Sequence, residues 1–390
     1  MHTVESYYPA SNGMAEVVKQ LSERLVIMGH KVTVATKKIK ERTSDTINGV
    51  QVKEFDIKGN TVNGIIGEVE KYRNFLLQSN YDIVTNFAAQ QWATDVALPI
   101  LGDIKGKKVN VPTGFSDFYK PEYQAYFKDM KTWMKEYDAN IFLSDNYRDI
   151  NFARENGITK NFLIPNGADE REFASLSPAV DIRKKFGLKP GCFLVLHIGG
   201  YTGLKGHKEA IEIFLRSSIK NGALLLIGNN VDYFKKRSIF KYYRTGLLWL
   251  SKYFSSKKIV MVSAPRNIIL ETYKQADLFL FPSNVECSPI VLFEAMAASL
   301  PYMVTDVGNS AEITKWSHGG IIMPTDKDVI HMSHPDIKGS VKLLNELYNN
   351  KALRSTLAES GRNSWKEKFT WDKIARQYED LYKKLVNGEA

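Results

Sequence analysis

The chain has 390 residues, of which 44% are hydrophobic and 25% charged, with 26 glycines and 13 prolines. This composition is that of an average globular protein, which excludes disordered, collagen-like and fibrous classes, and the length fits two domains better than one core. No apolar stretch has the length of a bilayer span, and the start, MHTVESYYPA, lacks the regions of a secretory leader. Two distant cysteines, Cys192 and Cys287, argue against a disulfide framework or a zinc knuckle. We therefore expect a cytoplasmic protein.

The positive charge is local. The formal net charge is +10, and residues 233–258 contain eight Lys or Arg and no Asp or Glu, which leaves +2 (10 − 8) for the rest of the chain. A general nucleic-acid-binding surface is not implied by such a distribution, and we expect no nucleic acid among the partners.

Strand-like and helix-like patterns alternate along the first part of the chain. The loop SYYPASNG leads into a helical pattern that ends before Gly29, and the strand candidate VTVAT follows. Further candidates for buried strands are YDIVTNF, KKVNVP, ANIFLS and NFLIPN. Alternation of this kind is typical of βα units and a parallel sheet.

The alternation restarts after the turn IPNGADEREF. The strand CFLVLHIGG precedes a glycine-rich loop and the helical EAIEIFLRSSI, and later strand candidates are ALLLIGN, KIVMVS, DLFLFPS and LPYMVTD. The tail, FTWDKIARQYEDLYKKLV, has helical periodicity but can pack on either half. The sequence thus predicts two successive α/β halves.

The most informative stretch is FPSNVECSPIVLFEAMAASLPYMVTDVGNSAEI, residues 281–313. A strand runs into a short loop that holds Glu286, and Pro289 stands where a helix would begin. A helix N-terminus after a strand suits a phosphate, and Glu294 lies close enough along the helix to reach a neighbouring group. Carboxylates would repel the phosphate itself, so hydrogen bonding to sugar or ribose hydroxyls is the better role for both. The alternative is that both are ordinary solvated glutamates.

This stretch resembles the E-x7-E signature, and the segment that follows it, of retaining glycosyltransferases of family four, which have the GT-B fold. The resemblance extends to YYPASNG, MGHKVTVAT, IPNGAD, the HIGGYTGLKG loop and the closing helix, in the family's order. It implies two Rossmann-like domains that face each other across a cleft, no essential metal and no cofactor, with a UDP- or GDP-sugar as donor substrate.

The resemblance also implies roles for single residues. Glu286 corresponds to the glutamate that contacts the donor sugar, Glu294 to the one that holds the ribose, and Lys205 to the lysine that clamps the diphosphate. The catalytic residues it implies are Glu286 and Lys205. The donor-binding residues it implies are Gly13, Gly200, Lys205, Glu286, Ser288, Ile290, Val291 and Glu294. A solvated loop lysine is the alternative for Lys205, and His197 and His207 are expected in core or surface roles.

On the acceptor side the resemblance implies Asn12, Thr113 and Asp117. Asn12 and Gly13 are similar to the family's glycine-rich first loop, although an Asn-Gly pair is also a common turn. The chain departs from the family at three points. Gly199 and Gly200 stand where a second diphosphate-clamping arginine is usual, Asn12 replaces a glycine, and Thr113 replaces a histidine.

Residues 233–258 hold eight aromatic residues beside their eight cations. Apolar residues recur at helical spacing with cations on the opposite side, which is the pattern of an interfacial amphipathic helix. A helix packed on the C-terminal half with a solvated basic face fits equally well. Binding of single-stranded RNA is a poorer third interpretation.

We therefore predict an α/β protein of GT-B architecture. Residues 1–168 are expected to form an acceptor-side domain, 169–367 a nucleotide-sugar donor domain, and 368–390 a helix that packs back on the first domain. The expected reaction moves a sugar from a nucleoside-diphosphate sugar to a glycan or lipid-linked acceptor with retention, in the cytoplasm and at an anionic membrane surface if 233–258 binds one. A silent nucleotide-sugar-binding protein and a GT-B epimerase are the alternatives.

Overall fold

The computed structural model describes residues 1–10, 12–229 and 256–389. The chain divides into two compact units, one of Met1–Asn166 with Trp371–Ala390 and one of Gly167–Thr370. Each unit has its own sheet and its own core, so we describe each by itself.

The first unit is built on an eight-stranded sheet with the order β10-β9-β8-β7-β1-β2-β4-β3, in which only the β3–β4 pairing is antiparallel. Its elements are β1 (His2–Thr3), α1 (Gly13–Ile27), β2 (Thr33–Lys37), β3 (Thr46–Ile47), β4 (Val50–Phe55), β5 (Ile57–Asn60), β6 (Gly64–Gly67), α2 (Val69–Gln78), β7 (Ile83–Phe87), α3 (Trp92–Asp95), η1 (Leu98–Asp103), β8 (Lys107–Val111), η2 (Pro121–Tyr123), α4 (Gln124–Glu136), β9 (Ala139–Phe142), α5 (Arg148–Glu155), β10 (Asn161–Leu163) and α15 (Trp371–Asn387).

The second unit is built on a six-stranded, wholly parallel sheet with the order β13-β12-β11-β14-β15-β16. Its elements are α6 (Ile182–Lys185), β11 (Phe193–Ile198), α7 (His207–Arg216), β12 (Gly222–Ile227), β13 (Lys258–Val262), α10 (Arg266–Gln275), β14 (Leu278–Phe281), α11 (Ile290–Ala297), β15 (Tyr302–Val304), α12 (Ser310–Ser317), β16 (Gly320–Ile322), β17 (Thr325–Lys327), β18 (Ser333–Pro335), α13 (Ile337–Asn349) and α14 (Lys351–Lys368).

Strand alternation gives this second sheet a core on each face. Leu194 and Leu196 of β11 pack into one cluster of buried residues, and Val195 between them packs into another. Successive side chains of a strand point to opposite faces, so a continuous apolar run such as FLVLHI is the expected sequence of a strand covered on both sides. The predicted α/β class with two Rossmann-like parallel-sheet units is confirmed.

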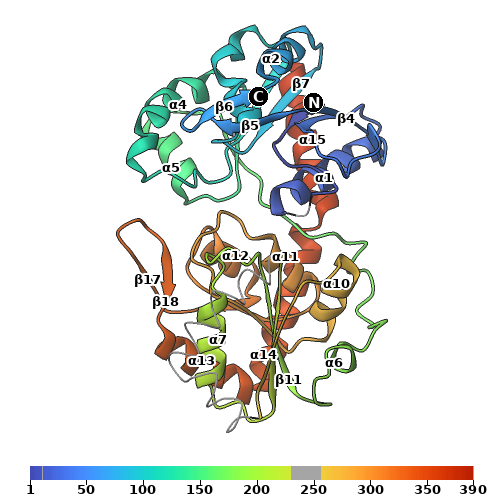
Figure 1. Ribbon diagram of the computed structural model, residues 1–390, viewed down its shortest axis with the longest axis vertical. Coiled ribbons are helices and arrows are strands. Elements are labelled where there is room, and N and C mark those ends of the chain that lie inside the picture. The colour runs from blue at the N-terminus through green and yellow to red at the C-terminus, as the bar shows by residue number, and fades with distance from the viewer. Residues whose placement is uncertain (11, 230–255, 390) are drawn as a thin grey trace. The chain divides into compact units, whose positions relative to one another are not determined.

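The C-terminal helix belongs to the first unit, where α15 lies beside α1 (Figure 1). The Tyr382 hydroxyl is 2.7 Å from Thr85 Oγ1 of β7, and Arg24 of α1 donates to Asp372 Oδ1 at 2.7 Å. The apolar side of α15 is buried, as the periodicity in the sequence indicates: Trp371, Ile374, Ala375, Tyr378, Leu381, Tyr382 and Leu385.

Candidate active site

The loop between β14 and α11 carries Glu286, and the loop after the neighbouring strand β11 carries Lys205. Glu286 Oε1 accepts hydrogen bonds from Lys205 Nζ at 2.6 Å and from Ser283 Oγ at 2.8 Å. Both loops follow the carboxyl ends of parallel strands, which is where open α/β sheets bind ligands. The structure thus brings together the two residues that the resemblance marks as catalytic, and adds Ser283, which the sequence did not indicate.

Gly206 explains why Lys205 is held at this position. Its φ is +71°, and a Cβ added to it would lie 1.9 Å from the backbone oxygen of Pro282. Only glycine adopts this conformation without strain and allows such a close approach. The chain therefore passes against the end of β14 one residue after Lys205, and α7 begins immediately afterwards.

The segment that contains Gly308 and Asn309 packs against the Glu286 loop. Gly308 has φ +56°, and an added Cβ would lie 2.2 Å from the backbone oxygen of Cys287. The Asn309 backbone N–H donates to that same oxygen at 2.8 Å, and its side-chain amide donates to Ser288 Oγ at 3.2 Å. These contacts fix the chain that leads into α11.

The first turn of α11 places three predicted donor-binding residues together. Ser288 is buried, Pro289 is the N-cap, and Ile290 and Val291 begin the helix. A helix N-terminus directs backbone N–H groups and a partial positive charge outward, which suits an anionic group. Gly200 lies on the loop after β11, where an added Cβ would come within 2.9 Å of Asn229 Oδ1.

Glu294 lies on α11 and is only 5% exposed, and the Glu286 side chain is only 12% exposed. The alternative that these are ordinary solvated glutamates is therefore wrong. Burial raises the pKa of Glu294, while Arg266 acts to lower it. The Arg266 guanidinium is 2.6 Å from Glu294 Oε1 and also pairs with Glu172, and the Tyr273 hydroxyl donates to Glu294 Oε2 at 2.8 Å.

Arg266 and Tyr273 were not predicted, because they belong to α10, 28 and 21 residues before Glu294 in the sequence. Neither residue lies in a motif. The apolar periodicity of α10 indicates that Tyr273 is buried, but not which polar group it meets.

The two histidines beside the glycine-rich loop are buried and neutral. Burial lowers the pKa of His197 to about 4 and, together with the nearby His197, that of His207 to about 2. His197 Nδ1 is 2.8 Å from the backbone oxygen of Leu280, and His207 Nε2 is 3.1 Å from that of Gly199. They hold the β11 loop in place, which is the core role expected from the sequence.

In the first unit, the residues expected on the acceptor side lie at two places. Asn12 is the N-cap of α1, where its Oδ1 accepts from the Ala15 N–H at 2.9 Å, and Gly13 is the first residue of the helix. Thr113 follows β8 with φ +59°, and Asp117 of the same loop pairs with Lys120 at 2.9 Å.

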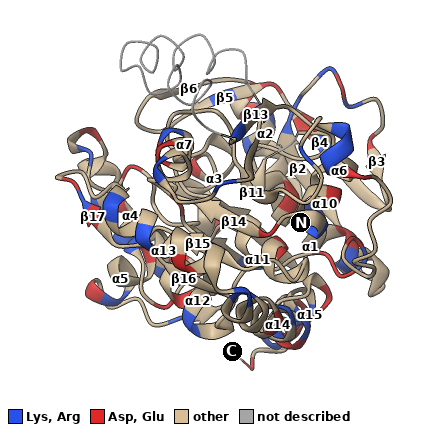
Figure 2. Cartoon of the chain, turned by 90° about the horizontal axis from the view of Figure 1, so that it is seen from below, with Lys and Arg blue, Asp and Glu red and all other residues tan. Residues whose placement is uncertain are grey.

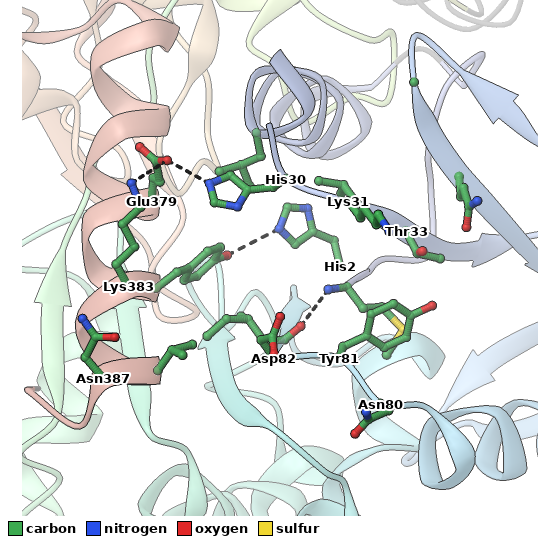
Figure 3. A pocket seen from close by; sticks show the side chains of 18 residues that line it. His2, His30, Lys31, Thr33, Asn80, Tyr81, Asp82, Glu379, Lys383 and Asn387 are labelled. Carbon is green, nitrogen blue, oxygen red and sulfur yellow. Dashed lines mark hydrogen bonds and ion pairs between the residues drawn. The ribbon is translucent and has the colours of Figure 1, made fainter. Parts of the chain in front are cut away.

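A cavity of about 660 Å³ lies elsewhere in the first unit, at the amino ends of β1, β2 and β7 and beside α15. In Figure 3, His30 and Lys383 contact Glu379 on one side of the cavity. Asp82 lies on another side. None of the residues predicted for the active site lines this cavity. It is at the opposite end of the strands from Thr113, so we do not assign the active site to it.

Most of the basic segment 233–258 lies outside the described residues, which resume at Ser256. Lys257 Nζ donates to the backbone oxygens of Phe214, Leu215 and Ser217 at the end of α7, and Lys258 Nζ donates to that of Gly187 at 2.7 Å. These two lysines are therefore bound to the fold. On α14 and α15, Lys and Arg stand among Asp and Glu (Figure 2).

Within residues 1–10, 12–229 and 256–389, no group of three His, Cys, Asp or Glu side chains is placed to hold a metal ion. None of the helices in these ranges combines the length and hydropathy that a bilayer crossing requires.

Comparison with solved structures assigns the two Rossmann-like units to the GT-B fold. Sucrose-phosphate synthase of Thermosynechococcus elongatus has the same fold, with a TM-score of 0.78 over 99% of both chains at 18% identity. Residues 180–364 match the family model described as "Glycosyl transferases group 1".

Two relatives extend this result. An uncharacterized glycosyltransferase of Methanocaldococcus jannaschii is 24% identical over 95% of this chain and 94% of its own length. The UDP-Gal:alpha-D-GlcNAc-diphosphoundecaprenol alpha-1,3-galactosyltransferase of Escherichia coli is 24% identical over 57% of this chain and 54% of its own.

Proposed function

We propose that this protein transfers a sugar from a UDP- or GDP-sugar to a glycan or lipid-linked acceptor with retention of the anomeric configuration. The observation that carries the proposal is the 2.6 Å pair of Lys205 Nζ and Glu286 Oε1 at the carboxyl ends of β11 and β14. It combines a cation suited to a diphosphate with a carboxylate suited to sugar hydroxyls, and Glu286 lies a few residues before the N-terminus of α11.

In this proposal the second unit binds the donor. Lys205 holds the diphosphate together with the α11 N-terminus, Glu286 binds the sugar, and Glu294 binds the ribose. The buried position of Glu294 between Arg266 and Tyr273 supports its role, because both partners stabilise the ionised carboxylate that accepts hydroxyl hydrogen bonds.

Donor binding then changes the partners of Lys205. In the structure its ammonium pairs with Glu286, and a diphosphate beside it would draw the ammonium toward itself and leave Glu286 to accept hydrogen bonds from the sugar. Catalysis consists mainly of positioning and of stabilising the leaving diphosphate by Lys205 and the helix-end amides. The departing diphosphate is the group that takes the acceptor proton.

The acceptor is proposed to bind to the first unit through the loops that carry Asn12, Thr113 and Asp117. The name of the Escherichia coli relative specifies a UDP-linked donor and a lipid diphosphate acceptor, which supports both choices for this chain. Residues 233–258 are proposed to bring the enzyme to an anionic membrane that carries such an acceptor.

The test is a screen of UDP- and GDP-sugars by calorimetry and mass spectrometry, followed by release of free nucleotide with and without candidate acceptors. Acceptor-dependent release with formation of a glycosylated product supports transfer. Binding without any release of nucleotide points to a silent sugar-nucleotide-binding protein, and conversion of one donor into its epimer points to an epimerase. Either of these results contradicts the proposal.

A further inference from the structure

Four non-glycine residues with left-handed backbone conformation gather at the carboxyl ends of two neighbouring strands in the first unit. Ala88 (φ +61°) and Gln90 (φ +63°) follow β7, and Thr113 (φ +59°) and Phe115 (φ +51°) follow β8. Gly114 between the last two has φ +97°. Such conformations cost free energy, persist only where the surroundings impose them, and cluster at functional sites.

Backbone hydrogen bonds join the loop after β7 to the loop after β8. The backbone N–H of Ala88 donates to Val111 O at 2.9 Å, and that of Ala89 donates to Pro112 O at 3.1 Å. The Asp117 N–H reaches Gln90 Oε1 at 3.4 Å. Because β7 and β8 are paired strands, the loops continue the sheet past its edge and present residues 113–117 at the end where ligands bind in such sheets.

Asp149 of α5 holds the loop after β8 by a hydrogen bond to its backbone. It is 1% exposed, its Oδ2 accepts the Gly114 N–H at 2.8 Å, and its Oδ1 accepts the Ile150 N–H at 3.0 Å. The preceding residue, Arg148, donates from Nη1 to Ser116 O at 3.2 Å. The start of α5 therefore makes polar contacts with two residues of the loop, Gly114 and Ser116.

Packing holds the same loop by a different means. Phe115 is buried, and its ring meets Phe127 of α4 at a centroid distance of 4.9 Å and Phe152 of α5 at 5.5 Å. The aromatic contacts fix where Phe115 lies, while the Gly114 N–H is the polar group that the left-handed turn directs into the interior. Asp149 is the group that satisfies it.

We propose that Asp149 is a positioning residue, which holds the 112–117 loop in its left-handed conformation so that the loop can bind the acceptor substrate. This inference rests on the proposed glycosyltransferase function, because it concerns acceptor recognition in that reaction. Asp149 does not touch the reacting atoms, and its effect passes through Gly114 to Thr113 and the rest of the loop.

The chemistry of the contact makes it sensitive to protonation. Both carboxylate oxygens face N–H donors, so a proton on either oxygen removes an acceptor. Burial raises the pKa of Asp149 to about 6, while its backbone hydrogen bonds and Arg148 act to lower it. As the pH falls through about 6, the contact to the loop is expected to weaken.

Two ion pairs lie on the loop and beside α5. Asp117 pairs with Lys120 at 2.9 Å on the loop, and Asp145 pairs with Arg154 at 2.5 Å beside α5. Arg148 is the charged group that acts on the Asp149 carboxylate.

The experiment compares the full-length wild type with Asp149→Leu, Asp149→Asn and the control Asp145→Leu. Leucine fills the site without an acceptor atom, whereas asparagine has one acceptor oxygen, as a protonated aspartate does, and does not titrate. Hydrogen exchange of peptides that cover residues 112–120 reports on the loop, and the KM values for acceptor and donor report on function.

We expect Asp149→Leu to speed exchange in residues 112–120 and to raise the acceptor KM by about tenfold to a hundredfold, with the donor KM unchanged. In the wild type the acceptor KM should rise as the pH falls through about 6. Asp149→Asn, which like the protonated carboxyl has one acceptor oxygen, should show at every pH the raised acceptor KM that the wild type reaches at low pH, and so lose this acid limb. Asp145→Leu should match the wild type throughout.

Thermal unfolding separates positioning from a purely structural role. The folded-state pKa of about 6 lies above the ordinary aspartate pKa of 3.8, so ionised Asp149 opposes folding above about pH 6. The Asn variant should therefore unfold at the same or a higher temperature than the wild type at neutral pH.

Two results would overturn the inference: wild-type exchange in residues 112–120 of the Leu variant, or an acid limb that persists in the Asn variant. If the Leu variant does not fold, the Asn variant decides. If the wild type transfers no sugar to any acceptor, the proposed function fails, and hydrogen exchange still decides whether Asp149 holds the loop.

Discussion

The carboxyl ends of the two sheets are built by different means. In the second unit, opposite charges meet at the strand ends: Lys205 with Glu286, and Arg266 with Glu294. In the first unit, the loops after β7 and β8 carry left-handed residues fixed by buried side chains such as Asp149. Under the proposed function, the cation of the diphosphate site has a carboxylate partner before the donor binds, whereas the acceptor site depends on the shape of its loops.

The largest effect is expected when Lys205, the cation of the proposed diphosphate site in the second unit, is removed. Lys205→Ala should abolish measurable transfer, because the diphosphate loses its clamp and meets the Glu286 carboxylate with no lysine between them. Loss of a charged hydrogen bond should weaken nucleoside diphosphate binding by about 1.5 to 3 kcal/mol, measured by calorimetry. Lys220→Ala, an exposed lysine of the same unit, is the control. Full activity of the Lys205 variant would remove this loop from the donor site.

Gly206 and Gly203 form a matched pair of positions for substitution by alanine. Both have positive φ, but an added Cβ meets Pro282 O at 1.9 Å only at Gly206, and nothing within 4 Å at Gly203. We expect Gly203→Ala to lower the free energy of unfolding by about 1 kcal/mol from backbone strain alone. Gly206→Ala should cost about 3 kcal/mol and also weaken donor binding, because strain and overlap add and Lys205 is displaced. Denaturant titration would measure both, and equal losses would contradict the close approach.

Glu294→Ala should weaken binding of the nucleotide by about 1.5 to 3 kcal/mol, because it removes hydrogen bonds to the ribose. Glu286→Gln should instead leave nucleotide binding intact and slow turnover, because Glu286 is proposed to bind the sugar of the donor and not its nucleotide. Calorimetry with UDP and GDP measures nucleotide binding, and steady-state kinetics measure turnover, so together they separate the roles of Glu294 and Glu286. Unchanged affinity of the Glu294 variant for both nucleotides would reject its assignment to the ribose.

The smallest effect for each residue changed is expected at the membrane. Each cation near an anionic surface contributes on the order of 1 kcal/mol, so changing Lys235, Lys236, Arg237, Lys241 and Arg244 to Gln should reduce co-sedimentation with anionic vesicles. Lys257 and Lys258 are left in place because they bind backbone oxygens of the fold. Binding that survives moderate salt would indicate insertion of apolar residues, and binding lost in salt would indicate attraction alone. Equal pelleting of both proteins, or none, would eliminate membrane binding.

The sequence predicts the parts of this fold that depend on local pattern. DLFLFPS becomes β14, the helix expected after SYYPASNG begins at Gly13, and Pro289 is the N-cap of α11. Apolar periodicity and capping signals act over a few residues, so one sequence contains them. Lys205 and Glu286 were recognised through motifs, and their proposed roles stay predictions.

The sequence does not reveal contacts between distant elements. Arg266 meets Glu294 across 28 residues, and Asp149 meets Gly114 across 35, and no periodic pattern encodes either pair. Left-handed Thr113 and Phe115 could not be expected, because neither residue type favours that conformation and only the surrounding packing imposes it. The hairpins β5–β6 and β17–β18 were also missed, since their strands are three or four residues long.

The place of α15 in the first unit has a consequence for biosynthesis. The second unit is one continuous segment, Gly167–Thr370, whereas the first is assembled from both ends of the chain. During synthesis the strands of the first unit leave the ribosome well before α15, which follows the whole second unit in the chain. Until Trp371, Tyr378 and Tyr382 arrive, the surface they cover stays exposed on the nascent chain. The part made first is thus the part finished last, and a chaperone would find its longest-lived apolar target on α1 and β7.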